Sequence, residues 1–306
     1  MLNWLIANVS TKIMDLSLII STRNRSESLL RTLRCIEQMQ TEACWELVVV
    51  DNGSTDNTPE VLRMFAKDSS VNVVMVHEPN PGLANARNAG VRSAKGNILV
   101  FTDDDCLPAT DYLEQTIAVF AEDDMIGFAG GRILLYDPTD QPITIQESTV
   151  RETISPGQFV EAGLIQGANF AFRRTALLTS GAFDPFFGAG SYYAVEDIDA
   201  VARVSALGWH GVYDPRPLVY HHHGRKTVAD ADALESTYAH GRGAYYVKCM
   251  LEKQWSTEAW KQWYWATRRK TLLSLRREFT GGLSFFLRSL WDRGRRFRNL
   301  NFQDAE

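Results

Sequence analysis

The sequence has few cysteines, and they form neither a disulfide framework nor a zinc motif. Its 306 residues hold four cysteines and no Cys-x-x-Cys pair; they are Cys35, Cys44, Cys106 and Cys249. This scatter is typical of a reducing compartment rather than of a secreted scaffold. Cys106 directly follows three aspartates, and we interpret it as a small residue behind an acidic turn rather than as a metal ligand.

Long hydrophobic runs are also absent. No stretch reaches the length of about 20 uninterrupted apolar residues that a membrane span requires. The start of the chain holds Trp4-Leu5-Ile6-Ala7 but no basic segment ahead of a long apolar run, so it does not match a signal peptide. We therefore expect a cytoplasmic protein that at most rests peripherally on a membrane.

An excess of positive charge is missing as well. The net charge of -5 excludes a generally basic nucleic-acid binder. A hydrophobic content of 45% over this length is enough for one large domain with an appendage.

The first hundred residues alternate short apolar runs with amphipathic segments. The runs are rich in β-branched residues, which is typical of strands buried on both faces; they cover 16–20, 46–50, 71–76 and 98–101. Helical periodicity covers 26–38, 58–67 and 82–94. Alternation with short connections indicates a parallel α/β sheet, which binds ligands at the carboxyl ends of its strands.

The pattern changes after Cys106. We expect helices at 111–121 and 196–207, and shorter strands at 127–135, 169–173 and 219–223. We divide the chain into an N-terminal extension (1–14), a catalytic domain (15–232) and a C-terminal aromatic and basic helical region (233–306). Gly281-Gly282 is expected to break this last region into two helical pieces.

The C-terminal region combines tryptophans with arginines. Trp255, Trp260, Trp263, Trp265 and Trp291 lie here among many basic residues. This composition at near-helical spacing suits a helix in a membrane interface, so we predict peripheral membrane contact through 255–298. The alternative is a helical cap whose aromatic residues pack on the catalytic domain or on a second copy. The basic residues lack a recognisable nucleic-acid module, and no nucleic acid is expected as a partner.

Three adjacent carboxylates follow the apolar run at 98–101 directly: Asp103, Asp104 and Asp105. They repel one another unless something positive lies among them. Mg²⁺ or Mn²⁺ holding a diphosphate meets this need, because both ions prefer oxygen ligands. The alternative is a solvated acidic turn, but the position after a buried strand favours the metal site.

Two other segments are expected near the same edge of the sheet. Asp51 ends the second predicted strand, where a carboxylate can accept a hydrogen bond from a base or a ribose, and Gly53 permits a tight turn. Arg87 lies on a predicted helix whose N-terminus points toward the nucleotide. It either meets the nucleotide or pairs with a structural carboxylate.

Two polar clusters come later in the chain. Glu196 and Asp197 open a predicted helix, where the helix dipole favours carboxylates; the alternative is that one of them is a general base. Asp199 is expected to face the surroundings of its own helix. His221 and His223 share one face of a predicted strand, and a metal or diphosphate role for at least one stands beside a structural role.

Taken in order, these segments resemble the motifs of family 2 glycosyltransferases, which have the GT-A fold. The motifs are Ser21-Thr22-Arg23-Asn24-Arg25, Asp51-Asn52-Gly53-Ser54-Thr55-Asp56, Ala86-Arg87-Asn88-Ala89-Gly90, Asp103-Asp104-Asp105, Gln166-Gly167-Ala168-Asn169 with Phe172-Arg173-Arg174, Gly181-Ala182-Phe183-Asp184 and Glu196-Asp197-Ile198-Asp199. The resemblance covers about residues 15–225 and is specific because of the order. It implies an α/β fold with a Rossmann-like, mostly parallel sheet flanked by helices, to which this chain adds a C-terminal helical extension.

The resemblance also implies roles for single residues. The donor nucleotide sugar would be bound by Thr22, Arg25, Asp51, Arg87, Asp103 and Asp104, to which we add Arg23 and Gly53. A divalent metal, Mn²⁺ or Mg²⁺, would be held by Asp105 with Asp103, and His221 would lie near the diphosphate, with His223 added as a ligand. Gly167, Ala168 and Asn169 would border the donor sugar and acceptor, and Asp197 would be the catalytic base beside Glu196. The family often has an aromatic residue where this chain has Arg23, which argues against base stacking there.

The implied reaction is an inverting, metal-dependent transfer from a nucleotide-diphosphate sugar to a hydroxyl of a polyprenyl-linked or growing surface glycan. The Gln-x-x-Arg-Trp motif and the membrane spans of the processive members are missing, which favours a single addition. A sugar-1-phosphate nucleotidyltransferase should carry a glycine-rich loop after the first strand, but residues 21–28 hold no glycine. A non-catalytic nucleotide-sugar or glycan-binding protein is expected to lose the base or a metal aspartate, and both are present.

Overall fold

The computed structural model describes residues 14–252, 256–268 and 271–303, so the N-terminal extension, apart from Met14, and Trp255 lie outside the described residues. The strands are β1 (Leu16–Thr22), β2 (Trp45–Asp51), β3 (Val73–His77), β4 (Ile98–Asp103), β5 (Cys106–Pro108), β6 (Ile126–Leu135), β7 (Glu152–Ile154), β8 (Asn169–Arg173) and β9 (His210–His221). The helices are α1 (Ser26–Ile36), α2 (Thr58–Asp68), α3 (Leu83–Ser93), α4 (Tyr112–Ala121), α5 (Arg174–Thr179), α6 (Glu196–Ala206), α7 (Val228–Leu251), α8 (Ser256–Thr267) and α9 (Leu272–Gln303).

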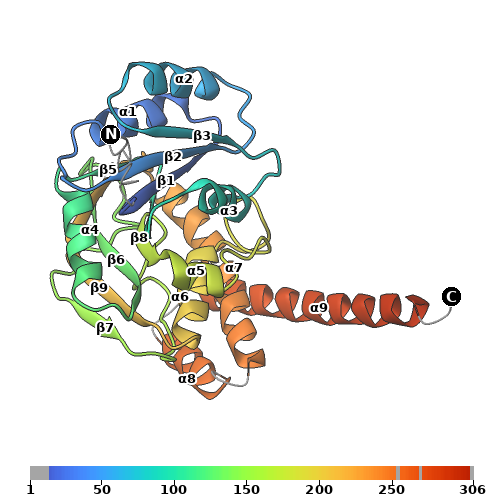
Figure 1. Ribbon diagram of the computed structural model, residues 1–306. Coiled ribbons are helices and arrows are strands. Elements are labelled where there is room, and N and C mark those ends of the chain that lie inside the picture. The colour runs from blue at the N-terminus through green and yellow to red at the C-terminus, as the bar shows by residue number, and fades with distance from the viewer. Residues whose placement is uncertain (1–13, 253–255, 269–270, 304–306) are drawn as a thin grey trace, which may run out of the picture.

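The strands form one sheet in the order β3-β2-β1-β4-β8-β6-β9-β5, with β7 paired to β9 (Figure 1). β3, β2, β1 and β4 run parallel, whereas β8 is antiparallel to both of its neighbours. β6 and β9 are parallel again, and β5 and β7 pair antiparallel with β9. The predicted α/β class with helices flanking the sheet and a C-terminal helical extension is confirmed.

Each face of the sheet has its own hydrophobic core. Successive residues of a strand point to opposite faces, so Leu18 and Ile20 pack beneath α1 while Ile19 packs beneath α3. The first core includes residues of α1, α2 and α4, and the second includes residues of α3, α5, α6 and α7. Because both faces are buried, the strands read as continuous apolar runs in the sequence.

Small residues bring α3 close to the sheet. A Cβ on Gly90 would lie 2.5 Å from Cγ2 of Ile19, so only glycine allows this approach. α3 begins at Leu83, next to the carboxyl ends of β1 and β4, and the Leu83 N–H donates to the Ala189 carbonyl. The close packing therefore brings Arg87 to the edge of the sheet where the acidic turn lies.

Several short or irregular elements differ from the sequence-based prediction. β9 spans His210–His221, whereas the sequence predicts only 219–223, because Pro215 and Pro217 interrupt the strand pattern. β5 and β7 have three residues each and α5 has six, and the sequence analysis predicts none of these elements.

The predicted helix break at Gly281-Gly282 is wrong. Both glycines lie inside α9, which is continuous from Leu272 to Gln303. They are placed where α9 crosses α7: a Cβ on Gly281 would lie 1.9 Å from the His240 carbonyl oxygen. The glycines therefore allow close helix contact rather than end the helix.

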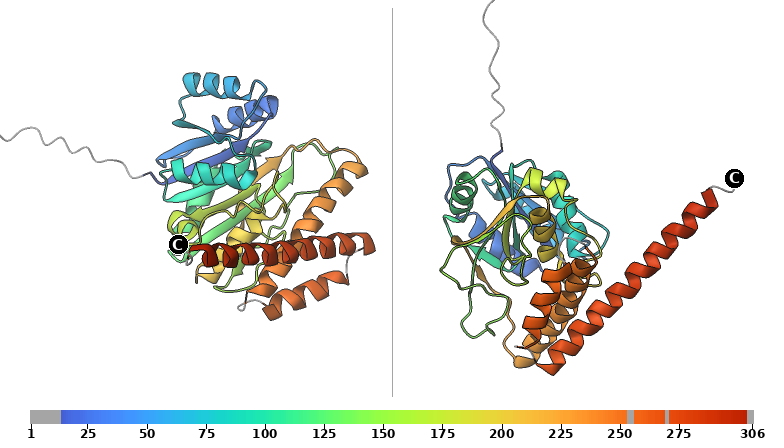
Figure 2. Two further views of the ribbon diagram at one scale, coloured as in Figure 1. Left: turned by 90° about the vertical axis from the view of Figure 1, so that its right-hand side faces the viewer. Right: turned by 90° about the horizontal axis from the view of Figure 1, so that it is seen from below.

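The C-terminal helices extend from the body of the molecule, and α9 projects beyond it (Figures 1 and 2). None of the described helices has both the length and the apolar character that crossing a bilayer demands. The predicted division at residue 232 falls within α7, and the domain limits stay a prediction.

Candidate active site

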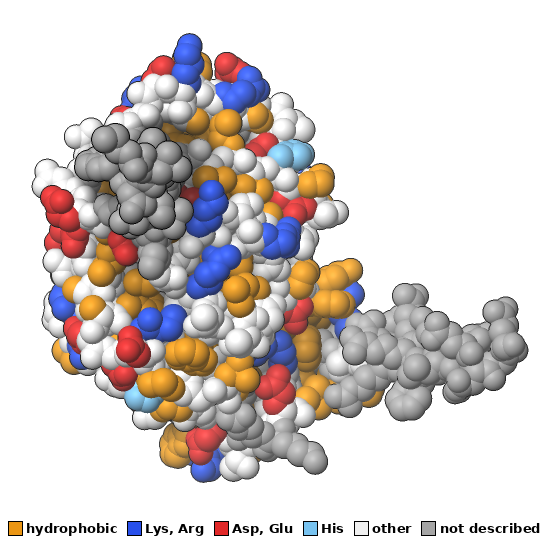
Figure 3. All heavy atoms as spheres, viewed as in Figure 1, with side chains coloured by type: hydrophobic (Ala, Val, Ile, Leu, Met, Phe, Trp, Pro, Cys, Tyr) orange, Lys and Arg blue, Asp and Glu red, His pale blue; other side chains and the backbone are white. Residues whose placement is uncertain are grey.

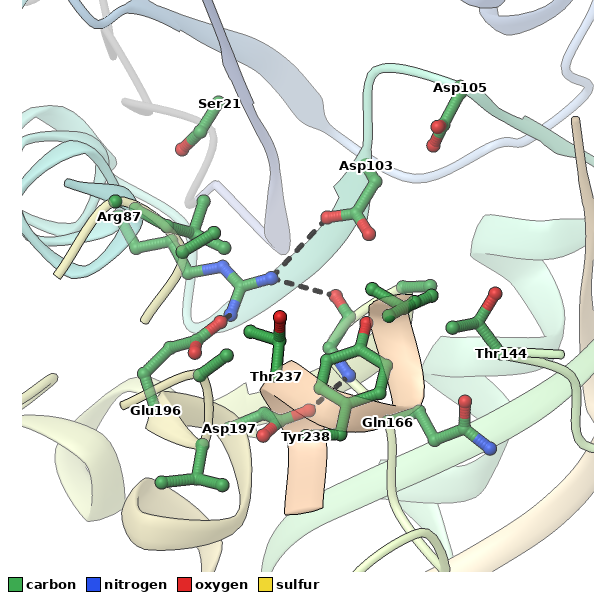
Figure 4. A pocket seen from close by; sticks show the side chains of 18 of the residues that line it. Ser21, Arg87, Asp103, Asp105, Thr144, Gln166, Glu196, Asp197, Thr237 and Tyr238 are labelled. Atoms are coloured by element: carbon green, nitrogen blue, oxygen red, sulfur yellow. Dashed lines mark hydrogen bonds and ion pairs between the residues drawn. The ribbon is translucent and has the colours of Figure 1, made fainter. Parts of the chain in front are cut away.

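A cavity of about 690 Å³ opens at the carboxyl ends of β1 and β4. One side is formed by the loop after β1 and by the acidic turn after β4, and another by the segment 162–168 and the start of α6. α7 contributes a further wall (Figure 4). This is the edge at which open α/β sheets bind ligands.

The acidic turn is held by the last residue of β1 and by the loop that follows it. The hydroxyl of Thr22 donates to Oδ2 of Asp104 at 2.6 Å. The guanidinium of Arg25 is 3.1 Å from Oδ1 of Asp104 and 2.6 Å from Oδ2 of Asp105. Burial raises the pKa of Asp104 to about 7 in spite of Arg25, so near neutral pH this carboxyl exists in both protonation states. The positive charge of Arg25 thus offsets part of the repulsion between these neighbouring carboxylates.

Asp105 faces His221 across the edge of the sheet. β5 and β9 pair antiparallel with Cys106 opposite His221, and this register places Nε2 of His221 3.2 Å from Oδ1 of Asp105. The ring Nδ1 lies 3.2 Å from the Thr144 carbonyl oxygen, to which it donates when protonated. Burial opposes protonation of His221, but its contacts with Asp105 outweigh this and raise its pKa. Burial likewise opposes ionisation of Asp105, but His221 and Arg25 lower its pKa below its usual range.

These residues fit a divalent metal. Within the described ranges, Oδ1 of Asp105 is buried and accepts no hydrogen bond. A histidine whose Nδ1 donates to a backbone carbonyl offers its Nε2 as a ligand atom. Cys106 also places its sulfur within 4.8 Å of the Asp105 and His221 ligand atoms, but burial raises the pKa of its thiol and favours the neutral form, which ligates poorly.

Arg87 connects three parts of the cavity. Its guanidinium contacts Oε1 of Glu196 at 2.7 Å, Oδ1 of Asp103 at 3.4 Å and the Gly167 carbonyl oxygen at 3.0 Å (Figure 4). The ring of Phe170 lies 4.9 Å below it. Arg87 is buried and pairs with these two carboxylates, and it also lines the cavity, so its contact with a nucleotide stays a prediction.

Glu196 and Asp197 are adjacent but differ in their surroundings. Glu196 is buried against Arg87, and burial raises its pKa to about 7. Asp197 lines the cavity, where its Oδ2 accepts from the Gly167 N–H at 2.8 Å and its Oδ1 from the Ile198 N–H at 2.7 Å. Asp199 contacts Arg203 on its own helix, and it also contacts Lys248 on α7.

Most of the predicted site residues line this one cavity. They are Thr22, Arg23, Arg25, Arg87, Asp103, Asp104, Asp105, Gly167, Ala168, Glu196, Asp197 and His221. Four other predicted site residues, Asp51, Gly53, Asn169 and His223, do not line the cavity. Asp51 accepts from the Ser54 N–H, and Gly53 has a φ of 72° in the same turn. The Asn169 amide donates to the Arg132 and Pro217 carbonyls, and His223 is placed between the Arg225 N–H and the Gln141 carbonyl, so both of its ring nitrogens have backbone partners.

The structure adds lining residues that the sequence analysis did not identify. Thr237, Tyr238 and Arg242 come from α7, and Thr144 and Arg225 come from loops. Burial, with Asp197 nearby, raises the pKa of Tyr238, so its hydroxyl stays neutral. No motif marks these residues. The path of the chain after β9 brings Arg225 and the α7 residues to the cavity, and the loop between β6 and β7 brings Thr144.

Comparison with known proteins establishes the family. Residues 17–179, which are 163 of the 306 residues, match the description "Glycosyl transferase family 2". The chain belongs to this family, and its fold is of the GT-A type.

Curated relatives share the N-terminal part. Glycosyltransferase AglE of Haloferax volcanii is 32% identical over 106 residues, which are 34% of this chain and 35% of AglE. Validoxylamine A glucosyltransferase of Streptomyces hygroscopicus subsp. jinggangensis is 35% identical over 130 residues, 40% of this chain and 29% of that enzyme. The aligned part thus spans about a third of the length of these relatives.

Solved structures agree in fold. The mannosyltransferase PcManGT from Pyrobaculum calidifontis, in complex with GDP-Man and Mn²⁺, has a TM-score of 0.61 at 22% identity and covers 78% of this chain and 64% of its own. S. aureus TarS in complex with UDP-GlcNAc has a TM-score of 0.57 at 18% identity and covers 78% and 67%. At these identities the likeness concerns the fold alone.

Proposed function

We propose that this glycosyltransferase is metal-dependent and inverting, and that it takes its sugar from a nucleotide-diphosphate donor. The observation that carries the proposal is the arrangement of one cavity, in which Asp105 and His221 face one end and Asp197 another, with Arg87 between them. The PcManGT and TarS complexes with nucleotide sugars support the donor class, and the Mn²⁺ bound to PcManGT supports the metal.

Asp105 and His221 would hold the metal, with Asp103 beside them. The buried Oδ1 of Asp105 and the Nε2 of His221 are the atoms that face each other. When bound, Mn²⁺ or Mg²⁺ would supply positive charge next to the diphosphate leaving group. We leave His223 out of the proposed ligands, because both of its ring nitrogens are occupied by backbone groups.

The donor nucleotide would lie along the end of β1 and the loop after it. Thr22, Arg23 and Ser21 line the cavity there, and within the described residues the buried Ser21 hydroxyl has no hydrogen-bond partner. Arg225 offers a further cation beside His221 for the diphosphate. Asp51 and Gly53 would act at the rim, where they shape the turn that follows β2.

Asp197 would act as the base. Two backbone N–H groups fix its carboxylate at the cavity wall, which satisfies the positional requirement for proton transfer. The acceptor hydroxyl gives its proton to Asp197 while its oxygen bonds to the anomeric carbon. The bond from that carbon to the diphosphate oxygen breaks on the opposite face, so the configuration inverts.

We infer that the acceptor is a glycan on a lipid carrier or a growing surface glycan, and that the enzyme works at the cytoplasmic side of a membrane. Support comes from α7, which lines the cavity and packs against α9. α9 exposes apolar side chains of a kind that suit a lipid environment.

The test is nucleoside-diphosphate release from a panel of nucleotide sugars, with Mn²⁺, with Mg²⁺ and without metal. We expect slow, metal-dependent hydrolysis of one donor, lost by about a hundred-fold or more in Asp105→Ala. Asp124→Ala is the matched control, because its side chain is fully exposed at 105% of the reference area. With an acceptor present, Asp197→Asn should reduce transfer by about a thousand-fold while donor binding persists.

Absence of both donor binding and release across the panel would contradict the proposal. Release that is equally fast with chelator present would refute the metal. A product with retained anomeric configuration, read by NMR, would refute the single displacement.

A further inference from the structure

α9 carries a stripe of exposed apolar side chains. Among the described side chains of this helix, seven large hydrophobic ones are exposed; besides Leu273, six of them form the stripe, at 38% to 87% exposure: Leu272, Phe279, Leu283, Phe286, Leu287 and Leu290. At 100° per residue, the intervals of seven, four, three, one and three residues place them on one face. The hydrophobic residues of a helix normally cover the core, so a stripe of this kind in solvent marks a binding surface.

The stripe lies opposite the face that holds α9 on the body. Glu278 and the glycines at 281 and 282 are buried on that other face. A Cβ on Gly282 would lie 2.7 Å from Cγ2 of Val247, and Glu278 contacts Nε of Arg242 at 3.0 Å. α9 is therefore fixed to α7 by its inner face, and the side chains of the apolar stripe stay partly or largely exposed.

The position of the helix leaves the stripe accessible. α9 has 32 residues and a length of about 48 Å, and it projects beyond the body in Figure 1 and in the right-hand view of Figure 2. Figure 3 shows hydrophobic side chains gathered where α9 leaves the body.

The charge of this region distinguishes two possible partners of the stripe, a second copy of the chain and a lipid bilayer. Residues 276–298 contain seven arginines against Glu278 and Asp292, in a chain whose net charge is -5. Arg276 lies within the apolar stripe itself, and one of the two acids, Glu278, is buried and paired with Arg242. A second copy of the chain would bring two segments of the same charge together, which is unfavourable. An anionic bilayer surface matches both the apolar stripe and the arginines.

We propose that α9 lies in the surface of an anionic lipid bilayer with this stripe among the acyl chains. The sequence predicts membrane contact through residues 255–298, and this proposal assigns that contact to the apolar stripe of α9. Since α9 is fixed to α7, docking also brings the α7 wall of the cavity, with Arg242, toward the lipid. This last consequence rests on the proposed function; the membrane contact does not.

The experiment is co-sedimentation of the full chain with phosphatidylcholine vesicles, with and without phosphatidylglycerol, at rising NaCl concentration. The test variant is Leu283→Gln/Leu287→Gln/Leu290→Gln, which keeps good helix formers. The control is Met64→Gln/Leu178→Gln/Leu207→Gln, whose three side chains are 58%, 48% and 54% exposed against 47%, 57% and 49% in the stripe. We expect binding to anionic vesicles that weakens with salt, falls about ten-fold or more in the test variant and stays in the control.

Three outcomes would overturn the proposal: no binding of the native chain, equal losses in both variants, or a dimer in light scattering that the stripe substitutions abolish without any vesicle binding. Donor hydrolysis in vesicle-free buffer separates this test from the proposed function. Neither triple variant alters a residue of the cavity, so hydrolysis should be unchanged. Vesicle binding by a chain that hydrolyses no donor would leave the docking surface standing and count against the proposed activity.

Discussion

Gly167 shows how one missing side chain keeps two charged groups in place. A Cβ at this position would lie 2.8 Å from Nη2 of Arg87 and 3.2 Å from Oδ2 of Asp197. Both groups are hydrogen-bonded to the Gly167 backbone, so they cannot retreat without loss of those contacts. A side chain at this position would displace the arginine or the proposed base, whereas glycine lets the backbone pass between them.

We expect Gly167→Ala to lower kcat by about ten-fold or more, because the carboxylate of Asp197, the proposed base, would be displaced and would lose its alignment with the acceptor. Donor affinity, read by isothermal titration with metal present, should change much less than kcat. A variant with native kcat would show that Asp197 tolerates the shift and that its present orientation is not needed.

Glu196 predicts a pH dependence of stability. Its pKa is about 7 in the folded protein against 4.5 for the free side chain, and burial is the main cause. The unfolded chain therefore releases this proton at lower pH than the folded chain does. The contribution of Glu196 is fully present below about pH 4.5 and is lost as the pH rises through about 7.

The Glu196→Gln variant has no carboxyl at this position, so it should not lose this contribution to stability as the pH rises. Urea unfolding at about pH 5 and about pH 7 should show a smaller fall in the free energy of unfolding than in the native chain, by about 1–3 kcal/mol. The comparison of slopes is robust even if the variant is less stable at both pH values. Identical slopes would mean that the carboxylate is already ionised beside Arg87 at low pH.

At the scale of elements, the contact of α7 with α9 depends on glycines that helix propensity disfavours. Glycine in a helix interior costs about 1 kcal/mol relative to alanine. A Cβ on Gly243 would lie 1.8 Å from the Glu278 carbonyl oxygen, and one on Gly281 would lie 1.9 Å from that of His240. The helix axes approach so closely that backbone meets backbone.

Gly281→Ala should therefore destabilise the protein by about 1–3 kcal/mol, although the same substitution in an isolated helix would stabilise it. The exposed neighbour Thr280 provides the control: Thr280→Ala should be neutral or slightly stabilising. Tm by differential scanning calorimetry measures both. A stabilising Gly281→Ala would show that α9 does not pack on α7 at this distance in solution.

The same contact explains one limit of the sequence analysis. β1 to β4 and α1 to α3 were predictable because burial on both sheet faces leaves long apolar runs and clear helical stripes. Gly281-Gly282 follows a local rule for helix breaks, and tertiary packing overrides that rule. β5, β7 and α5 are too short to leave a periodic pattern.

The residues of the cavity also fall into those that the sequence predicts and those that it does not. Asp105 and Asp197 were predictable as cavity residues because Asp105 follows a buried strand and Asp197 lies at the start of a helix, and Arg87 because it belongs to an ordered set of motifs. Tyr238 and Arg242 were not, because they lie on α7 in the middle of a helix without any distinctive spacing. Only the crossing of α7 over the cavity gives them a place in the site.

On the scale of the whole molecule, the cavity joins elements from distant parts of the chain. β1, β4, α6, β9 and α7 all contribute lining residues, so a ligand that fills the cavity contacts segments from residue 21 to residue 242. Binding of such a ligand to the folded chain alone must raise the free energy of unfolding.

We therefore expect Mn²⁺ together with a nucleoside diphosphate to raise Tm by about 5 °C at concentrations well above Kd. Mn²⁺ alone should give a smaller rise, because the diphosphate completes the oxygen ligands around the ion. Asp105→Ala should remove most of the joint effect, since it deletes the buried oxygen that faces His221, whereas Asp124→Ala should keep it. A joint effect of the same size in Asp105→Ala would place the metal elsewhere, and an equal rise from the diphosphate without metal would show that Arg25 and Arg225 bind it unaided.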